Sequence, residues 1–355
     1  MNRFIQLHIL TAYPPANLNR DDLGRPKTAK MGGTDRLRIS SQSLKRTWRT
    51  ADLFQQAMAG HIGTRTKRLG LSCYETLLAG GVADKSALVC AKAIAGQFGV
   101  LKKDKDDPLN ELEIQQLVHV STIEQTAING LVEVLIAENR EPTEDELELL
   151  RYDNQCVDIA LFGRMLASKP SFNVEAACQV AHAISVHPVV IEDDYFTAVD
   201  DLNDNSVDAG AAHIGETGFA AGLFYSYICI NRQQLIDNLS GNEALAETAI
   251  QALTEAAVKV APSGKQNSFG SRAYASYVMA ESGDQQPRSL SVAFLKPIDQ
   301  RTSDDFASDA ITALERQQEY FDEVYGACAD QRCVINAVAS GGSSLKDLLT
   351  FVGRE

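Results

Sequence analysis

Eight cations gather between residues 25 and 49 of this chain, where Asp35 is the only acidic residue. The net charge of this stretch is about +7, whereas the whole chain of 355 residues carries −14, which leaves about −21 elsewhere. Lysine and arginine side chains displace the counterions condensed on phosphates, so the segregation predicts a surface for a polyanion. The cations are Arg25, Lys27, Lys30, Arg36, Arg38, Lys45, Arg46 and Arg49.

A strand and a helix must position these cations. Residues 36–40 alternate, which predicts a strand with Leu37 and Ile39 inward and with Arg36 and Arg38 outward.

The helix that follows has Ser40 or Ser41 as its expected N-cap. One stripe of this helix is apolar and predicted to pack, and it holds Leu44, Trp48, Ala51 and Met58. The opposite side presents Gln42, Lys45, Arg46 and Arg49. Free N–H groups at a helix N-terminus favour anions, so a phosphate site is expected here. The alternative is a solvated face that balances acidic neighbours.

Two loops add further cations. Residues 13–35 are irregular and too long for a simple turn, which predicts a functional loop carrying Arg20, Arg25, Lys27 and Lys30. The second loop, residues 262–272, is rich in small residues and carries Lys265 and Arg272. It is no Walker loop, because Gln266 stands where a serine or threonine must follow the lysine.

Catalytic and metal chemistry finds little support in the sequence. The six histidines form no recognisable pair, and Asp21, Asp22 and Asp35 are the only loop candidates for acid–base catalysis. The seven cysteines include no C-x-x-C pair, and the carboxylates of residues 192–208 lack EF-hand spacing. We therefore expect no disulfide framework, metal site or cofactor, while an enzyme that uses one of these loop aspartates and an unrelated small-molecule enzyme remain alternatives.

Composition predicts an ordinary folded protein, with 45% hydrophobic and 23% charged residues. The N-terminus lacks a signal-peptide pattern, and no apolar stretch approaches the roughly 18 residues of a membrane span. A cytoplasmic protein without a membrane partner is expected.

The order of elements predicts an α+β fold. A half-buried strand at residues 3–10, with a structural His8, precedes the loop, strand and helix described above. Residues 60–180 are predicted mainly helical, with helices at 86–98 and 109–138, another begun by Thr143, and an apolar segment at 153–168. A strand at 181–190 and a hairpin at 189–218 follow, then a strand at 219–231 and a helix at 232–260 interrupted near Gly241. The chain then continues with strands at 274–280 and 290–294 and a mostly helical stretch at 304–353. This order of elements resembles a ferredoxin-like or RRM-type antiparallel sheet with two insertions.

Five segments, in order along the chain, closely resemble the CasC backbone subunits of the type I-E CRISPR Cascade complex, in the RAMP superfamily. They are residues 18–22, 38–46, 157–165, 181–184 and 195–201, and the most specific is the run Arg-Ile-Ser-Ser-Gln-Ser-Leu-Lys-Arg. The resemblance runs from residue 3 to about residue 270 and is loose after about 285.

The resemblance implies a hand-like architecture and a non-catalytic function. Several copies would polymerise along one guide crRNA and hold it for pairing with target DNA in antiviral defence, beside the large, small and crRNA-end-binding Cascade subunits. The implied regions are a palm at 1–59, with the RNA-binding loop and basic helix, helical fingers at 60–178, a palm strand at 179–188, a thumb hairpin at 189–218, the second part of the palm at 219–300 and a C-terminal helical segment at 301–355.

The resemblance also implies RNA contacts, residue by residue. Phosphate contacts fall on Arg20, Lys27, Ser40, Gln42, Lys45, Arg46 and Arg49, with Lys265 and Arg272 as weaker candidates. Met165 becomes a wedge beside a kinked nucleotide, and the thumb contacts to the displaced base become Phe196, Thr197, Val199 and Ile214.

This chain departs from the family at Thr34 and Asp35, where relatives can be basic, which weakens phosphate attraction locally. The aromatic RNP signature of RRM domains is also absent, so the palm is not expected to stack bases.

Overall fold

A computed structural model describes residues 2–104, 106–153, 155–198, 213–299, 303–339 and 342–354. The chain divides into two compact units. The first contains Met1–Phe54, Val180–Cys229 and Ile250–Glu355, and the second contains Gln55–Gln179 and Ile230–Ala249.

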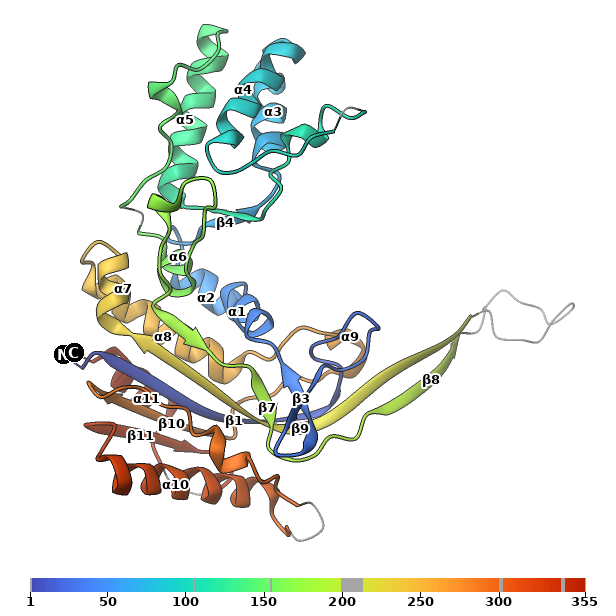
Figure 1. Cartoon of the computed structure of the whole chain (residues 1–355), viewed down its shortest axis with the longest axis vertical. Helices are drawn as coiled ribbons and strands as arrows, with labels where there is room; N and C mark the ends of the chain where they lie inside the picture. Colours follow the sequence, from blue (N-terminus) through green and yellow to red (C-terminus); the bar gives the residue numbers. More distant parts are fainter. Residues whose placement is uncertain are drawn as a thin grey trace, which may run out of the picture. The chain divides into compact units, whose positions relative to one another are not determined.

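The first unit is built on a large sheet with the strand order β11-β10-β1-β9-β7-β3-β2 (Figure 1). Strand β10 pairs antiparallel with both β1 and β11, and β7 pairs antiparallel with both β3 and β9. The predicted α+β class with a large antiparallel sheet is therefore confirmed. The strands are β1 (Phe4–Ala16), β2 (Thr28–Met31), β3 (Thr34–Ile39), β7 (Ala183–Ser185), β8 (Glu192–Ala198), β9 (His213–Asn231), β10 (Tyr277–Gly283) and β11 (Gln331–Asn336).

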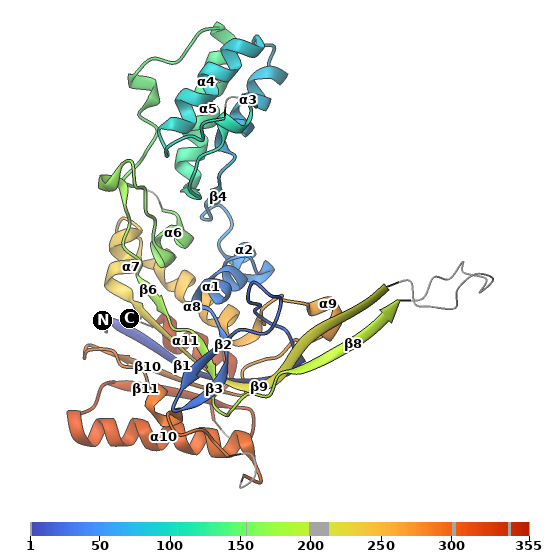
Figure 2. The same cartoon turned by 45° about the vertical axis from the view of Figure 1, so that its right-hand side comes forward.

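Helices cover both faces of this sheet. α10 lies on one side, and α1 and α8 lie on the other in both views (Figures 1 and 2). Both faces of β1 are consequently buried, including Gln6 and His8, and the prediction of a half-buried strand was wrong. The helical elements are α1 (Ser41–Arg49), α9 (Gln266–Phe269), η4 (Ser291–Phe294), α10 (Phe306–Tyr325) and α11 (Leu345–Gly353), while α2 (Asp52–Ala57), α8 (Glu243–Lys259) and strand β6 (Cys178–Val180) cross the unit boundary.

The second unit is mainly helical. Helices α3, α4 and α5 share an apolar core that includes Leu77, Ile94 and Leu135, and α3 contacts both other helices (Figure 2). Its elements are β4 (Thr64–Thr66), α3 (Leu69–Ala79), α4 (Asp84–Gly96), η1 (Asn110–Leu112), β5 (Val118–Val120), α5 (Thr122–Glu138), η2 (Asp145–Leu147), α6 (Val157–Phe162), η3 (Pro170–Phe172) and α7 (Arg232–Asn238).

Five predicted elements differ in the structure. The helix expected at 109–138 is replaced by η1, β5 and α5, because the alternating residues of β5 pair with β4. Thr143 precedes only the short η2. The strand expected at 290–294 is the 3-10 turn η4, and the C-terminal stretch contributes the edge strand β11. The loop expected at 13–35 is shortened at both ends, since β1 runs to Ala16 and β2 forms a hairpin with β3.

Arg36 is fully buried, so its predicted outward orientation was wrong. Its guanidinium donates hydrogen bonds to the Thr34 hydroxyl at 2.8 Å, to the carbonyl of Ser185 at 2.8 Å and to that of Phe294 at 2.9 Å. The β2–β3 turn also packs closely on the η4 end, because a Cβ atom on Gly32 would lie 1.6 Å from the Leu295 carbonyl oxygen. A charged side chain tolerates burial when its donors are satisfied in this way.

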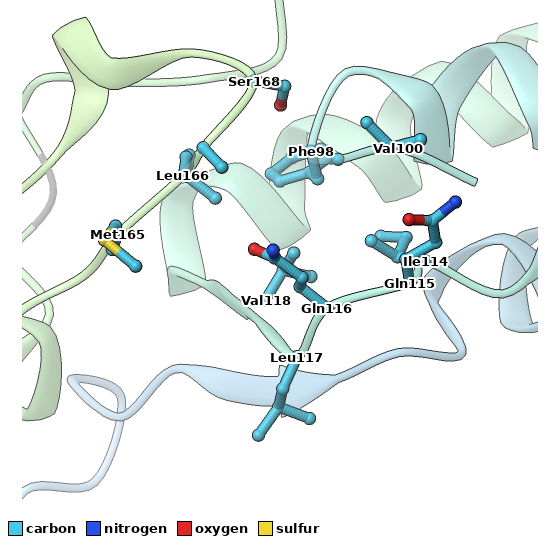
Figure 3. A pocket seen from close by; sticks show the side chains of 12 residues that line it. Phe98, Val100, Ile114, Gln115, Gln116, Leu117, Val118, Met165, Leu166 and Ser168 are labelled. Carbon is cyan, nitrogen blue, oxygen red and sulfur yellow. The ribbon is translucent and has the colours of Figure 1, made fainter. Parts of the chain in front are cut away.

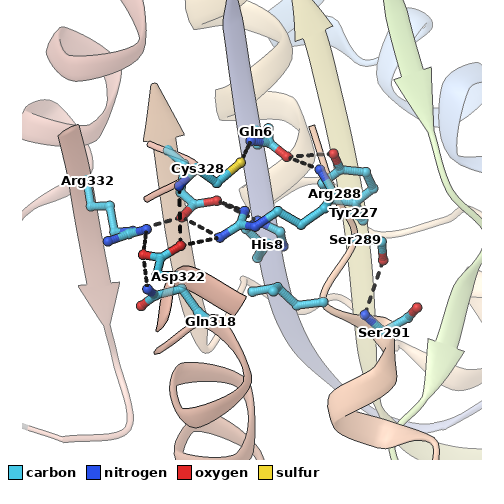
Figure 4. A network of polar contacts seen from close by, with 12 residues as sticks. Gln6, His8, Tyr227, Arg288, Ser289, Ser291, Gln318, Asp322, Cys328 and Arg332 are labelled. Carbon is cyan, nitrogen blue, oxygen red and sulfur yellow. Dashed lines mark hydrogen bonds and ion pairs between the residues drawn. The ribbon is translucent and has the colours of Figure 1, made fainter. Parts of the chain in front are cut away.

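A buried polar network lies between the sheet and α10 (Figure 4). The strand register aligns Gln6 with Glu281 and Glu281 with Arg332 on the same sheet face. The Glu281 carboxylate accepts from Arg332 Nε at 2.7 Å and also from Arg288, and both arginines pair with Asp322.

His8 completes this network. Its Nε2 lies 3.2 Å from a Glu281 oxygen, and its Nδ1 lies 2.9 Å from the Tyr225 hydroxyl. Burial lowers the pKa of His8. Burial raises the pKa of the Glu281 carboxyl, but hydrogen bonds from His8 and Arg288 outweigh this effect and hold that pKa well below its usual range. A neutral His8 that donates to an ionised Glu281 satisfies both groups, which is the structural role predicted for His8.

Replacing Glu281 with glutamine is expected to lower the free energy of unfolding by about 3 to 5 kcal/mol, because two arginines lose a buried carboxylate. Urea denaturation at pH 7 measures this change. Glu319→Gln, on the exposed face of α10, is the control and should change stability by less than about 0.5 kcal/mol. Equal effects of the two variants would contradict the assigned role of Glu281.

Stability should also fall with decreasing pH in two intervals. The folded-state pKa values of His8 and Glu281 are both depressed, so each group's contribution is present above its unfolded pKa and is lost as the pH falls below it. These unfolded values are about 6.5 for histidine and about 4.3 for glutamate. Unfolding free energies measured from pH 8 to pH 5 should decline less in a His8→Gln variant than in the natural chain.

Candidate nucleic-acid interface

Helix α1 has a buried stripe and a polar face, as predicted, but it ends at Arg49, so Ala51 and Met58 of the predicted stripe lie beyond it. On the polar side, Lys45 and Arg49 are partly buried. Leu44 and Trp48 are buried, while Gln42 and Arg46 are exposed. The guanidinium of Arg46 makes no hydrogen bond or ion pair with any residue that the structure describes, so it is available to a ligand. Arg49 and Arg46 lie in the last turn, where the helix dipole favours positive charge.

Ser40 is the N-cap of α1 and is mostly buried, which confirms the predicted start of the helix. Its hydroxyl accepts from the Ser43 amide at 3.3 Å, and its own amide donates to Asn19 Oδ1 at 2.9 Å. The Ser40 side chain is therefore engaged within the protein. Ser40 thus fixes the start of α1, and the cations lie further along the helix.

The loop before β2 is folded back on itself. Arg20 forms an isolated bridge with Pro26, and the Lys27 amide donates to the Asn19 carbonyl at 2.8 Å. The buried Asn17 side chain donates to the carbonyl of Gly24 at 2.9 Å and to that of Gly218 at 2.8 Å. This loop thus presents an exposed Arg20 from a fixed backbone, and it is tied to strand β9.

Lys265 joins Arg20 at one cavity of about 570 Å³. The loop that carries Lys265 packs directly on the first loop, since a Cβ atom on Gly264 would lie 2.3 Å from the Leu18 carbonyl oxygen. Arg25 also lines this cavity, but its guanidinium is paired with Asp193 at 2.9 Å. The two predicted cations Arg20 and Lys265 are therefore brought together from segments about 245 residues apart in the sequence.

Strands β8 and β9 form the stem of a hairpin that extends from the sheet (Figure 2). Thr197 is exposed and pairs in register with Ile214, whose side chain is not described, and Val199 lies outside the described residues. Phe196 is 43% exposed and pairs with Gly215. A Cβ atom on Gly215 would lie 2.4 Å from Phe196 Cζ, so the ring covers the glycine.

Met165 lies in the second unit, beyond the end of α6 at Phe162. Its side chain is 76% exposed. A small cavity of about 60 Å³ is lined by residues 98–100, 114–118 and 165–168. Leu166 points toward Phe98 in this cavity, whereas Met165 lies at its margin (Figure 3). Met165 is thus no core methionine, which was the alternative to a wedge.

The residue before Met165 anchors it. Arg164 is 1% exposed at its side chain and pairs with the fully buried Glu124 through Nη1, at 2.8 and 2.9 Å from the two carboxylate oxygens. Glu124 also closes the capping box of α5 with Ser121. The Arg164 amide donates to the Val174 carbonyl at 3.0 Å, and the Val174 amide donates to the Arg164 carbonyl at 2.9 Å. The chain turns at Gly163, whose φ is 81°. Sequence reasoning missed this pair, because 40 residues separate its partners and no local pattern joins them.

The loop aspartates make structural contacts. Asp21 Oδ1 accepts from the amides of Leu23 and Arg25, both at 2.9 Å, which stabilises the turn. Asp35 lies opposite Lys30 in the β2–β3 ladder. His119 pairs with the buried Asp158 at 2.8 Å. Among the described residues, no group of three or more histidine, cysteine or acidic side chains could hold a metal ion.

Breaking the Arg164–Glu124 pair is expected to destabilise the second unit. Arg164→Ala leaves a buried carboxylate unpaired, which should cost about 3 to 5 kcal/mol in chemical denaturation. The control is Arg140→Ala, which removes a more exposed pair with Glu146 in the same unit and should cost about 1 kcal/mol or less. A small effect at Arg164 would show that the pair does not anchor residues 163–165.

The whole fold is shared with chains of solved CRISPR RNA-guided surveillance complexes. One such complex, described as pre-nicking, contains a chain with a TM-score of 0.83 and 28% identity, over 98% of this chain and 99% of that one. A chain of another CRISPR RNA-guided surveillance complex has a TM-score of 0.61 and 26% identity, over 98% of both chains.

The chain belongs to the CT1975-like protein family, whose model matches residues 5–349. The match therefore includes the residues after about 285, where the resemblance noted in the sequence was loose. A comparison with curated proteins finds no match. No described helix is both long enough and apolar enough to cross a membrane.

Proposed function

We propose that this protein is a non-catalytic backbone subunit of a CRISPR surveillance complex that binds a guide crRNA along its length. The observation that carries the proposal is the α1 surface, where Leu44 and Trp48 anchor the helix and leave Arg46 exposed beside Gln42. The solved chains of similar fold belong to RNA-guided complexes, which supports guide RNA as the polyanion.

Within this proposal the first unit acts as an RRM-like palm. The second unit corresponds to the fingers, and the β8–β9 hairpin corresponds to the thumb. We assign the subunit to the CasC type of the type I-E Cascade and the RAMP superfamily, on the segments that resemble that family. The protein would work in the cytoplasm.

Self-association along the RNA is part of the proposal. Its support is the β8–β9 stem. All residues of β8 are exposed, as expected of a strand that contacts another molecule in an assembly. Neighbouring copies, the other Cascade subunits and target DNA paired with the crRNA are the expected partners. The guide RNA would recognise the target sequence by base pairing, and the protein would bind the backbone of the RNA.

Loss of the cations should weaken RNA binding in a salt-dependent way. Each phosphate contact removed from single-stranded RNA should reduce the slope of log affinity against log salt by about 0.7. Arg46→Gln, Arg20→Gln and Lys265→Gln are the test variants, measured by fluorescence anisotropy at several salt concentrations. Arg316→Gln, an exposed arginine of α10, is the matched control. An unchanged slope in all three test variants would contradict the proposal.

The alternative is an RNA endonuclease of the same superfamily that uses a loop aspartate. We expect no cleavage when the purified protein is incubated with matched RNA and magnesium, because Asp21 is committed to its turn and Asp35 lies opposite Lys30 in the β2–β3 ladder. RNA fragments on a denaturing gel that disappear in an Asp35→Ala variant would favour the endonuclease.

A further inference from the structure

A second cavity in the first unit, of about 640 Å³, lies between α2, the end of α8 and the segment after α9. Its side chains include Leu53, Lys259, Gln266, Arg272 and Tyr274. None of its lining residues is acidic, although the whole chain carries a charge of −14. The cavity formed by Arg20 and Lys265 differs, because Asp193 and Glu216 line it as well. An acid-free cavity with two cations favours an anionic ligand.

Tyr274 gives this cavity an aromatic wall. Its side chain is 70% exposed, and its hydroxyl has no hydrogen-bond partner among the described residues. Its backbone is held, because the next amide, that of Ala275, donates to the Val258 carbonyl at 2.8 Å, and the Ser276 amide donates to the Leu10 carbonyl at 2.8 Å. An exposed ring on a fixed backbone loses little freedom when it binds a ligand.

The two cations differ in availability. Lys259 is paired with Glu255 at 2.6 Å, one helical turn earlier. Arg272 is exposed, and its side chain has no partner in the part of the chain that the structure describes. Arg272 is therefore the cation best placed to contact a ligand phosphate.

The cavity adjoins the proposed RNA surface on two sides. Leu53 follows Arg49 by four residues, just beyond the end of α1. Gln266 lines this cavity, whereas the preceding Lys265 lines the cavity shared with Arg20. An RNA strand that is bound by α1 and by Lys265 would thus continue into this cavity, toward Tyr274 and Arg272.

We propose that this cavity binds one nucleotide of single-stranded RNA, with the base stacked on Tyr274 and the phosphate held by Arg272. The site rests on the proposed function and extends it from backbone contact to base stacking. Every base has a π-face, so a tyrosine platform binds RNA without selecting its sequence. An acidic protein segment would use the cations but would leave the exposed ring without a partner, so the cavity favours RNA.

Photocrosslinking tests the contact directly. The full-length protein is irradiated with single-stranded RNA that carries 5-bromouridine, and the modified residue is identified by mass spectrometry. A crosslink at Tyr274 is expected, and it should persist in the Arg46→Gln variant at saturating RNA. Crosslinks confined to other residues would overturn the proposal.

Affinity measurements separate stacking from charge. Tyr274→Ala should weaken binding roughly 5- to 150-fold, while Tyr274→Phe, which keeps the ring, should retain the affinity. Arg272→Gln should lower the salt slope by about 0.7. The matched control is Tyr325→Ala, which removes a tyrosine on α10 that is 82% exposed and should leave binding unchanged. Thermal unfolding verifies that each variant folds.

The outcomes distinguish this site from the proposed function. Weakened binding in Arg46→Gln with normal binding in Tyr274→Ala would refute the stacking site and leave the proposed function standing. Normal binding in Tyr274→Ala together with an unchanged salt slope in all three cation variants of the proposed function would refute both proposals. If Tyr274→Ala impairs association between copies but leaves RNA affinity unchanged, the cavity binds protein and the proposal is wrong.

Discussion

The guanidinium of Arg36 holds together the part of the first unit that carries the proposed RNA surface. It joins its own strand to the carbonyls of Ser185 and Phe294, which come from β7 and η4. Strand β3 ends at Ile39, and α1 starts at Ser41 with Ser40 as its cap, so any shift of β3 would move the helix. A buried charge is stable only while its hydrogen bonds persist, which makes this junction rigid.

Rigid placement lets an acidic protein present a basic surface. The cations that can contact an external phosphate are those whose side chains have no acidic partner within the protein. Arg25 is neutralised by Asp193, and Lys259 is paired with Glu255, whereas Arg20 and Arg46 have no ion pair with a described residue. The net charge of residues 25–49 therefore includes cations that are already paired within the protein. It also leaves out Lys265 and Arg272, which the fold brings to the proposed RNA surface.

The sequence predicted the elements that local patterns define and missed those that distant contacts define. The cap at Ser40, the burial of Leu44 and Trp48 and the break near Gly241 depend on neighbouring residues, and the structure confirms them. The predicted continuation of the first helix to Met58 was wrong, because α1 ends at Arg49 and a separate α2 follows. The burial of Arg36 depends on acceptors about 150 and 260 residues away, so alternation alone placed it wrongly. β5 and β11 were missed for the same reason, because each strand exists through its pairing partner.

The RNA contacts that the family resemblance implies fall into two groups in the structure. Some side chains already have a structural role, and others are exposed and contribute little to the core. Phe196 covers Gly215, and the Ser40 hydroxyl caps α1, so both already have structural roles that RNA contact would have to share. Met165 is the opposite case, since its exposed side chain contributes little to the core while the adjacent Arg164 is almost completely buried. An exposed apolar side chain on a rigid anchor is unfavourably solvated and adds little stability, and the proposed insertion beside a nucleotide would account for its position.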